Sequence, residues 1–425
     1  MNLYTREDLN AMSVHTLRVV LRTDFKGVPG VMNKAELIDK ILSIQSGEKP
    51  PVRSTKGRKP LGEFLTPADI ELHLSDFEGV DGDVPQSVKG VLELHAEGYG
   101  FIRLGGLDIT PSDVYVSKTL VKKFSLKSGD EVEGDCAQMR DSGVVTLKSV
   151  KSVNGGANFE QKRVDFSTFT PNYPNKKIIL YNGENPALGL IDLFSPLGEG
   201  QRCLVLDKTG RRKTEFLKDL ISSLVKSGKK VCLTSVCSKP EDVTAYKQSG
   251  VSVVEISSDC QPQKIVRKAI LSVEVLKRQL EIGNSSVLIL TDVNSVISAY
   301  EDCALTDKID QGFLSDGLTA RSVAKKILNC AGCYGERGSL TVIGVLKSDL
   351  KDREYSDLFD VATSVITLAD NPRKRRGYSV DPVNSFTDGD ENLLTAKEIE
   401  KADSYRAKLA ENPDFMDEIL AEITK

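Results

Sequence analysis

The chain has 425 residues, which is too long for one ordinary hydrophobic core, so we expect two or three domains joined by linkers. Lys and Arg total 57 against 61 Asp and Glu, and the net charge of -4 gives no overall sign of nucleic-acid binding, so any basic surface has to be local. No run approaches the roughly 20 apolar residues of a membrane span, and the first residues lack the apolar core of a signal peptide. We therefore expect a cytoplasmic protein that does not enter a membrane.

Composition and apolar spacing divide the chain into five segments. Helical spacing predicts a small helical head over residues 1–45, and a stretch rich in Pro, Gly, Ser and positive charge predicts a linker and lead-in over 46–85. Short β-rich runs separated by Gly and Asp predict a small β-barrel over 86–155, followed by a connector over 156–186. Over 187–425, apolar strands alternate with amphipathic helices, which predicts a parallel sheet covered by helices on both faces.

Two aromatic residues and an arginine alternate within the barrel segment, at Tyr99, Phe101 and Arg103. Alternate side chains of a β-strand project from the same face, and such a face suits stacking with unpaired bases. Tyr115, in the next β-rich run, is a further candidate for stacking. Because the flanking glycines allow a base to approach and an arginine is out of place in an apolar core, we favour RNA contact over a role in the barrel core.

A phosphate-binding loop of the form GxxxxGK[ST] is expected after the first strand of the parallel sheet, because its backbone amides have to wrap the phosphates. The chain has DKTGRRKT there, at residues 207–214. Lys213 and Thr214 are retained, so Lys213 is a candidate for phosphate and Thr214 for magnesium. However, Arg212 replaces the glycine before the lysine, and Asp207 brings negative charge to the start of the loop. Both changes oppose an ordinary ATP site.

The strings VLELHAEGYGFIRLGG and DVYVSKTLVKKFSLKSGD resemble the cold-shock-type RNA-binding domain of the Rho family of bacterial transcription terminators, and the similarity continues almost to the end of the chain. The resemblance implies a multidomain α+β and α/β fold, in which a helical head and an oligonucleotide-binding barrel precede a RecA-like NTPase domain. It also implies a six-subunit ring that binds cytosine-rich single-stranded RNA on the barrel and pulls it through the centre using ATP. The family's base pocket takes an acid and an aromatic residue from a later strand, and here only the acid remains, as Asp141.

The positions to which the resemblance assigns ATP chemistry are altered. Thr291 stands at the place of the metal-holding acid, with Asp292 one residue later, and Ser238 replaces the catalytic glutamate. A serine cannot take a proton from the attacking water at neutral pH. Asp370 stands at the place of the arginine finger, with four basic residues shortly after it, at 373–376. The resemblance also implies that an aromatic residue stacks on adenine and that three lysines contact RNA at the centre of the ring: Phe359 for adenine, and Lys308, Lys347 and Lys351 for RNA.

Three functions remain open, and the sequence does not decide whether the protein is an enzyme. The first is an RNA-binding Rho-like protein that acts in transcription termination or its regulation with impaired ATP hydrolysis, as a homo-oligomer or together with an intact Rho. The second is an active, divergent RNA-dependent ATPase that uses ATP and Mg, with Asp292 as the candidate catalytic residue. The third is a non-enzymatic scaffold or partner of an intact Rho ring. RNA polymerase is a further candidate partner.

Overall fold

The computed structural model describes residues 4–12, 17, 20–21, 34–45, 87–138, 144–157, 163–305, 320–370 and 377–424. The chain forms two compact units, Met1–Leu65 and Thr66–Lys425, which are considered separately. The predicted linker over 46–85 lies outside the described residues.

The first unit contains the helices α1 (Arg6–Ala11) and α3 (Lys34–Gln45). Helix α1 begins at a capping box, in which the Thr5 hydroxyl accepts the backbone N–H of Asp8 and the Asp8 carboxylate accepts the backbone N–H of Thr5. Helix α3 buries apolar side chains from successive turns, and these form a small core with Leu9 of α1. The expected helical character of this segment is therefore present.

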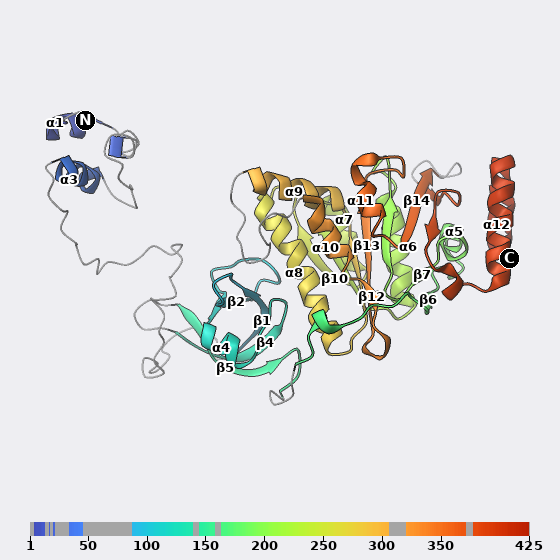
Figure 1. Ribbon diagram of the computed structural model, residues 1–425, viewed down its shortest axis with the longest axis horizontal. Coiled ribbons are helices and arrows are strands. Elements are labelled where there is room, and N and C mark those ends of the chain that lie inside the picture. Colours follow the sequence, from blue (N-terminus) through green and yellow to red (C-terminus); the bar gives the residue numbers. More distant parts are fainter. Residues whose placement is uncertain are drawn as a thin grey trace. The chain divides into compact units, whose positions relative to one another are not determined.

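In the second unit, five strands close into a barrel in the order β1-β2-β3-β5-β4 (Figure 1). They are β1 (Ser87–Leu94), β2 (Gly100–Arg103), β3 (Val114–Val116), β4 (Glu131–Gln138) and β5 (Val145–Val153). A short helix, α4 (Lys118–Lys123), follows β3 and begins at Ser117, whose side chain accepts a backbone N–H. Alternate strand residues such as Leu92, Ile102 and Val114 fill the apolar core. The prediction of a small barrel is confirmed.

A larger sheet follows, with strand order β10-β9-β11-β13-β8-β14-β15. From β10 to β14 all neighbours on this path are parallel, and β15 pairs with β14 in the antiparallel direction. The strands are β8 (Arg202–Leu206), β9 (Val231–Val236), β10 (Ser252–Ile256), β11 (Ser286–Leu290), β13 (Ser339–Leu346), β14 (Ser364–Asp370) and β15 (Tyr378–Val380). Two further strands of two residues each join this sheet, β12 (Gly332–Cys333) beside β13 and β16 (Phe386–Thr387) beside β14. The strands β6 (Lys177–Ile178) and β7 (Leu197–Gly198) form a separate two-stranded sheet.

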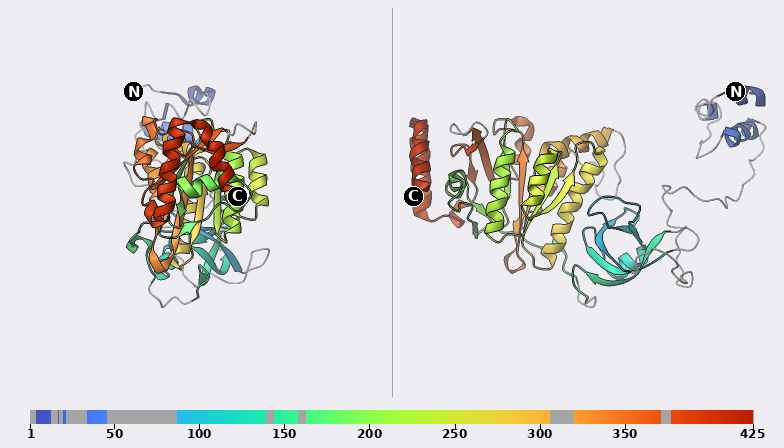
Figure 2. Two further views of the ribbon diagram at one scale, coloured as in Figure 1. Left: turned by 90° about the vertical axis from the view of Figure 1, so that its right-hand side faces the viewer. Right: turned by 180° about the vertical axis from the view of Figure 1, so that it is seen from behind.

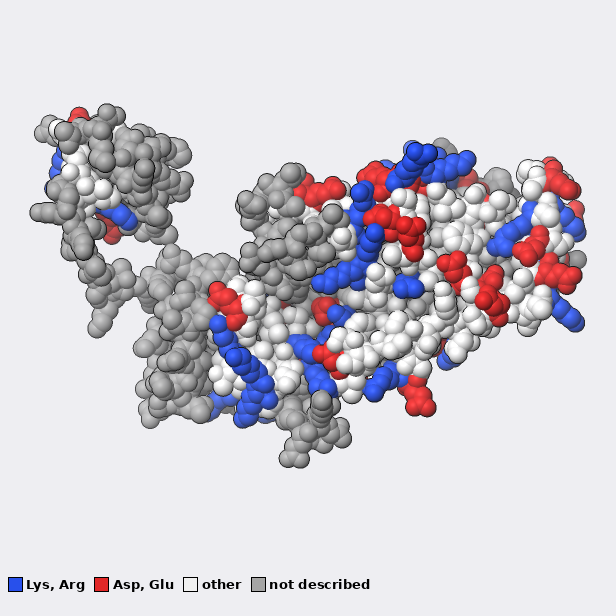
Figure 3. Space-filling model, in the orientation of Figure 1, with Lys and Arg blue, Asp and Glu red and all other residues white. Residues whose placement is uncertain are grey.

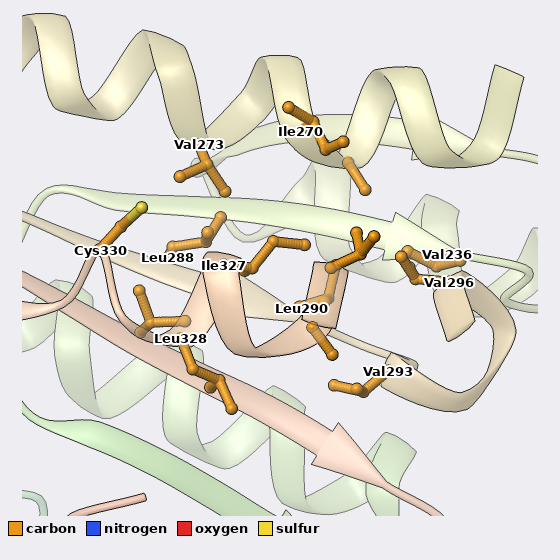
Figure 4. Close-up of a cluster of buried hydrophobic side chains, with 14 of the residues drawn as sticks. Val236, Ile270, Val273, Leu288, Leu290, Val293, Val296, Ile327, Leu328 and Cys330 are labelled. Atoms are coloured by element: carbon orange, nitrogen blue, oxygen red, sulfur yellow. The ribbon is translucent and has the colours of Figure 1, made fainter. Parts of the chain in front are cut away.

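Helices cover both faces of this sheet (Figures 1 and 2). One face packs on α8 (Pro262–Glu281), α9 (Val293–Leu305) and α10 (Ala320–Leu328), where Ile270 and Val273 of α8 approach Leu288 of β11 (Figure 4). The other packs on α5 (Pro186–Phe194), α6 (Lys213–Lys226) and α7 (Pro240–Gln248). The helices α12 (Ala396–Glu411) and α13 (Met416–Ile423) pack against α5. Further described helices are α11 (Ser356–Phe359) and the short 3-10 helices η3 (Phe166–Thr168), η4 (Gly335–Arg337), η5 (Arg353–Tyr355), η6 (Asp390–Asn392) and η7 (Pro413–Phe415). The predicted α/β layering is confirmed.

Within the described ranges, no helix combines the length and the apolar character needed to cross a membrane.

Candidate RNA-binding face and phosphate-binding loop

Three aromatic side chains form a cluster on the outside of the barrel. The ring centres of Tyr99, Phe101 and Tyr115 lie 5.7–5.9 Å from one another, and none of the three belongs to the apolar core that surrounds Ile102. Tyr99 and Phe101 therefore share a face, as their alternation predicts. Phe101 is partly exposed, whereas Tyr99 and Tyr115 are only 4% and 5% exposed. Burial raises the pKa of Tyr115 to about 12.

The sequence did not indicate that a histidine would join this cluster. The His95 ring lies parallel to the Tyr99 ring, with their centres 4.6 Å apart and an interplanar angle of 13°. Its Nδ1 accepts the backbone N–H of Glu97, in the turn between β1 and β2. The backbone N–H of His95 donates to the carbonyl of Tyr99, so these two residues face each other across the turn between β1 and β2. The sequence could have indicated the contact only if the pairing of these two strands had been predicted residue by residue.

The structure corrects our expectation for the surroundings of Arg103. The residue is 8% exposed, its Nε donates to Glu93 at 2.6 Å, and its Nη1 donates to Asp113 at 2.7 Å. Its guanidinium carbon lies 5.3 Å from the centre of the Phe101 ring. A buried arginine is stabilised when buried carboxylates pair with it, as Glu93 and Asp113 do here. Our argument that an arginine at this position has to be exposed was therefore wrong. Arg103 contacts the Phe101 ring of the aromatic cluster, and its direct contact with RNA stays a prediction.

The candidate phosphate-binding loop connects β8 to α6 and is organised around Asp207, which is fully buried. Its Oδ2 accepts the backbone N–H groups of Arg212 at 2.8 Å and Lys213 at 2.9 Å. Its Oδ1 accepts the Thr209 hydroxyl at 3.1 Å and Nη1 of Arg212 at 3.3 Å. Backbone amides at the start of a helix are the groups that bind phosphate in such loops. Here a side chain of the same loop occupies two of them.

The remaining polar groups of the loop also have carboxylate partners. Nζ of Lys213 donates to Asp292 at 3.1 Å, and the Thr214 hydroxyl donates to Asp242 at 3.1 Å. Nε of Arg212 donates to Asp370, at the end of β14, at 2.8 Å. Sequence reasoning missed Asp242 as a partner, although it lies in the Pro-Glu-Asp run that drew attention to Ser238. The side chains of Lys213, Thr214 and Arg212 therefore each have a carboxylate partner within the protein.

The hydroxyls of Thr291 and Ser238 form hydrogen bonds at the carboxyl ends of β11 and β9. The Thr291 hydroxyl accepts the backbone N–H of Val236 at 2.9 Å and lies 3.1 Å from the Ser238 hydroxyl. Asp292, one residue later, reaches Lys213 and also accepts the backbone N–H of Ser295 at the start of α9. An acid thus stands beside the loop lysine although it is displaced by one position in the sequence.

A cavity of about 160 Å³ lies beside the loop, and its lining includes Asp207, Lys213, Asp292 and Lys347. The structure therefore brings Lys347, which we assigned to a central RNA loop, next to Gly210 of the phosphate-binding loop. Lys351 is exposed, and the roles of both lysines stay predictions.

Other predicted residues lie apart from this cavity or beyond the described ranges. Phe359 is partly buried and packs against the core on the α8 face of the sheet, and adenine contact stays a prediction. Lys308, Asp141 and the basic residues 373–376 lie outside the described residues. Among the residues that are described, no group of three or more His, Cys, Asp or Glu could hold a metal ion.

Comparison with known proteins agrees with this architecture. Residues 88–158 match the family model described as "Rho termination factor, RNA-binding domain". Transcription termination factor Rho of Mycobacterium tuberculosis (strain H37Rv) is 30% identical over 338 residues, which are 75% of this chain and 55% of the relative. The Bacillus subtilis Rho is 25% identical over 352 residues, covering 80% and 82%. The chain therefore spans about half the length of the mycobacterial relative.

Among solved structures, an ATP synthase subunit from Nanoarcheaum equitans superposes with a TM-score of 0.50 at 12% identity, covering 77% of this chain and 85% of that one, which indicates a shared fold alone. A closed β-barrel followed by a mostly parallel sheet with helices on both faces is the architecture of a multidomain protein whose larger domain has a RecA-like fold. This chain is therefore similar to Rho factors over most of its length, and its barrel matches their RNA-binding domain.

Proposed function

We propose that this Rho-like protein binds single-stranded RNA through its barrel and acts in transcription termination or its regulation, with slow or absent ATP hydrolysis. The observation that carries the proposal is the aromatic cluster of Tyr99, Phe101 and Tyr115 outside the barrel core. Aromatic rings on a strand face stack with unpaired bases, at roughly 1–3 kcal/mol per base. The match of residues 88–158 to the Rho RNA-binding domain supports the same assignment.

Charge alone does not explain such binding. On the face seen in Figure 3, Lys and Arg are interspersed with Asp and Glu across the described residues, so no surface of a single sign covers it. A protein that bound only phosphates would be expected to carry a basic stripe. We therefore expect base stacking to contribute to the affinity, in addition to any contact with phosphates.

This proposal is tested by comparing single-stranded RNA with a duplex of the same length at equal salt. We expect the single strand to bind at least about tenfold more tightly, because paired bases do not offer their faces to aromatic side chains. Fluorescence anisotropy with labelled RNA measures both affinities. Equal affinity for the two would indicate phosphate contacts alone and would contradict the role of the aromatic face.

Slow hydrolysis is proposed from the charges around the loop. Phosphoryl transfer needs a lysine, a metal ion and an arginine around the phosphate, together with an oriented water. Ser238 and Thr291 stand where the resemblance expects carboxylates, and Asp370 stands where it expects the arginine finger. Loss of that finger alone is worth a factor of about 10³ to 10⁵.

We therefore expect RNA-stimulated ATP hydrolysis at least about a hundredfold below that of an intact Rho measured in parallel. Phosphate release from the purified protein, with and without RNA, measures the rate. Arg212→Gly alone is not expected to rescue turnover, because the base and the finger are still missing.

One observation favours the second candidate function, an active and divergent RNA-dependent ATPase. Lys213 donates to Asp292, so an acid does stand beside the lysine that precedes Thr214, the candidate ligand of Mg. Robust turnover that is abolished by Lys213→Ala would replace slow hydrolysis by this alternative.

We also propose self-association, because the relatives of this chain are Rho factors and the resemblance implies a ring. Sedimentation velocity, run with and without RNA, is expected to show species well above the mass of a monomer in at least one of the two conditions. A strict monomer in both conditions would instead favour a scaffold role, as a partner of an intact Rho ring or of RNA polymerase.

A further inference from the structure

The phosphate-binding loop already contains an anion in the place where a nucleotide phosphate would bind. A single oxygen of Asp207 accepts two successive backbone N–H groups, those of Arg212 and Lys213, at 2.8 and 2.9 Å. This is the hydrogen-bonding pattern that a phosphate oxygen makes at the start of a helix, where the helix dipole also favours negative charge. The side chain of Asp207 is only 1% exposed and lines the cavity beside the loop, so its negative charge opposes a second anion there.

The arginine that replaces the loop glycine supplies the matching positive charge. Its guanidinium lies between Asp207 and Asp370, with Nη1 3.3 Å from the first and Nε 2.8 Å from the second, and its side chain is 10% exposed. A buried carboxylate without a cation would be unfavourable, so the two substitutions compensate each other. This explains why the acid at 207 and the arginine at 212 occur together in one loop.

We propose that Asp207 is a built-in substitute for the nucleotide phosphate, which holds the loop closed and keeps nucleotide out of it. The inference rests on the proposed function and deepens it, because it makes RNA binding and assembly independent of ATP. It also differs from a simple loss of catalytic groups, since a site that has only lost its base and finger would still bind ATP.

The test is Asp207→Gly in the full-length protein, with inorganic pyrophosphate as the probe. Without pyrophosphate the variant is expected to unfold at a lower temperature than the natural protein, because the amides of Arg212 and Lys213 lose their acceptor. Pyrophosphate is expected to raise the unfolding temperature of the variant and not that of the natural protein. Isothermal titration calorimetry is expected to show at least about tenfold tighter pyrophosphate binding to the variant, since the charge that repels the anion is gone.

Asp192 provides a matched control elsewhere in the same domain. Its carboxylate also accepts two successive backbone N–H groups, those of Leu180 and Tyr181, and it has no connection to the loop. Asp192→Gly is expected to lower the unfolding temperature without any recovery on adding pyrophosphate. Lys213→Ala in the Asp207→Gly background is expected to abolish the recovery, which excludes binding of pyrophosphate elsewhere.

The inference is wrong if the natural protein binds pyrophosphate or ATP as tightly as the variant, or if the variant loses stability without recovery. Should Asp207→Gly not fold, Asp207→Asn keeps the size of the side chain and one acceptor oxygen while removing the charge. This variant is also expected to have a lower unfolding temperature and to bind pyrophosphate more tightly than the natural protein. RNA affinity measured on the same samples separates the two proposals. If the natural protein binds nucleotide and also binds RNA, only the proposed role of Asp207 is wrong. If the natural protein does not bind RNA, only the proposed function is wrong.

Discussion

Replacing Tyr99 and Phe101 together by alanine is expected to weaken the binding of single-stranded RNA by roughly 2 to 6 kcal/mol if both rings stack, because each ring that stacks on a base contributes about 1–3 kcal/mol. Phe101 is partly exposed and Tyr99 lies behind it, at 4% exposure. Phe101→Ala is therefore expected to account for the larger part of the loss. Fluorescence anisotropy with a short unstructured RNA measures the effect, at one fixed salt concentration because phosphate contacts depend on salt.

Two further variants separate stacking from packing. Phe101→Leu keeps an apolar side chain but removes the aromatic face, so it is expected to lose most of the affinity that Phe101→Ala loses. Phe415→Ala removes an aromatic residue from the far end of the chain, where it packs on Tyr405, and is expected to leave RNA affinity unchanged. Unchanged RNA affinity in the Tyr99 and Phe101 double variant would show that these rings serve the barrel and not RNA.

Arg103→Met is expected to lower the free energy of unfolding by roughly 3 kcal/mol, at the lower end of the range for breaking a buried ion pair. The change leaves the carboxylates of Glu93 and Asp113 buried without this guanidinium. We take the lower end because Arg267 of α8 continues to pair with Glu93, and Asp113 still accepts the backbone N–H of Thr110. Urea unfolding followed by circular dichroism measures the change.

Lys247→Met is the control for this experiment, because it removes one partner of an ion pair whose side chains are 55% and 46% exposed. Such surface pairs contribute about 0–1 kcal/mol. Two results together would contradict this prediction: Arg103→Met is as stable as the natural protein, and the slope of RNA affinity against salt concentration falls by the amount expected for about one lost phosphate contact. Arg103 would then bind RNA phosphate directly.

Much of the fold could be predicted from local patterns, because burial leaves a periodic trace in the sequence. The run Ser286–Leu290 is buried at every residue, as expected of a central parallel strand. In β2, Ile102 enters the barrel core while Phe101 does not, as strand alternation requires. The altered phosphate-binding loop was also recognisable, since Lys213 and Thr214 follow directly after an apolar strand.

The sequence by itself therefore determined the barrel, the parallel sheet, the shared face of Tyr99 and Phe101, and the substitutions at 207 and 212. Only the tertiary structure decided which partners the charged residues have. Arg212 meets Asp370, which is 158 residues away, and Arg267 meets Glu93, which is 174 residues away. The burial of a helix or strand produces a periodic pattern of apolar residues close together in the sequence, so the element can be predicted from that segment alone. A charged side chain is instead stabilised by whichever opposite charge the fold brings within a few ångströms, and no local pattern encodes that distance.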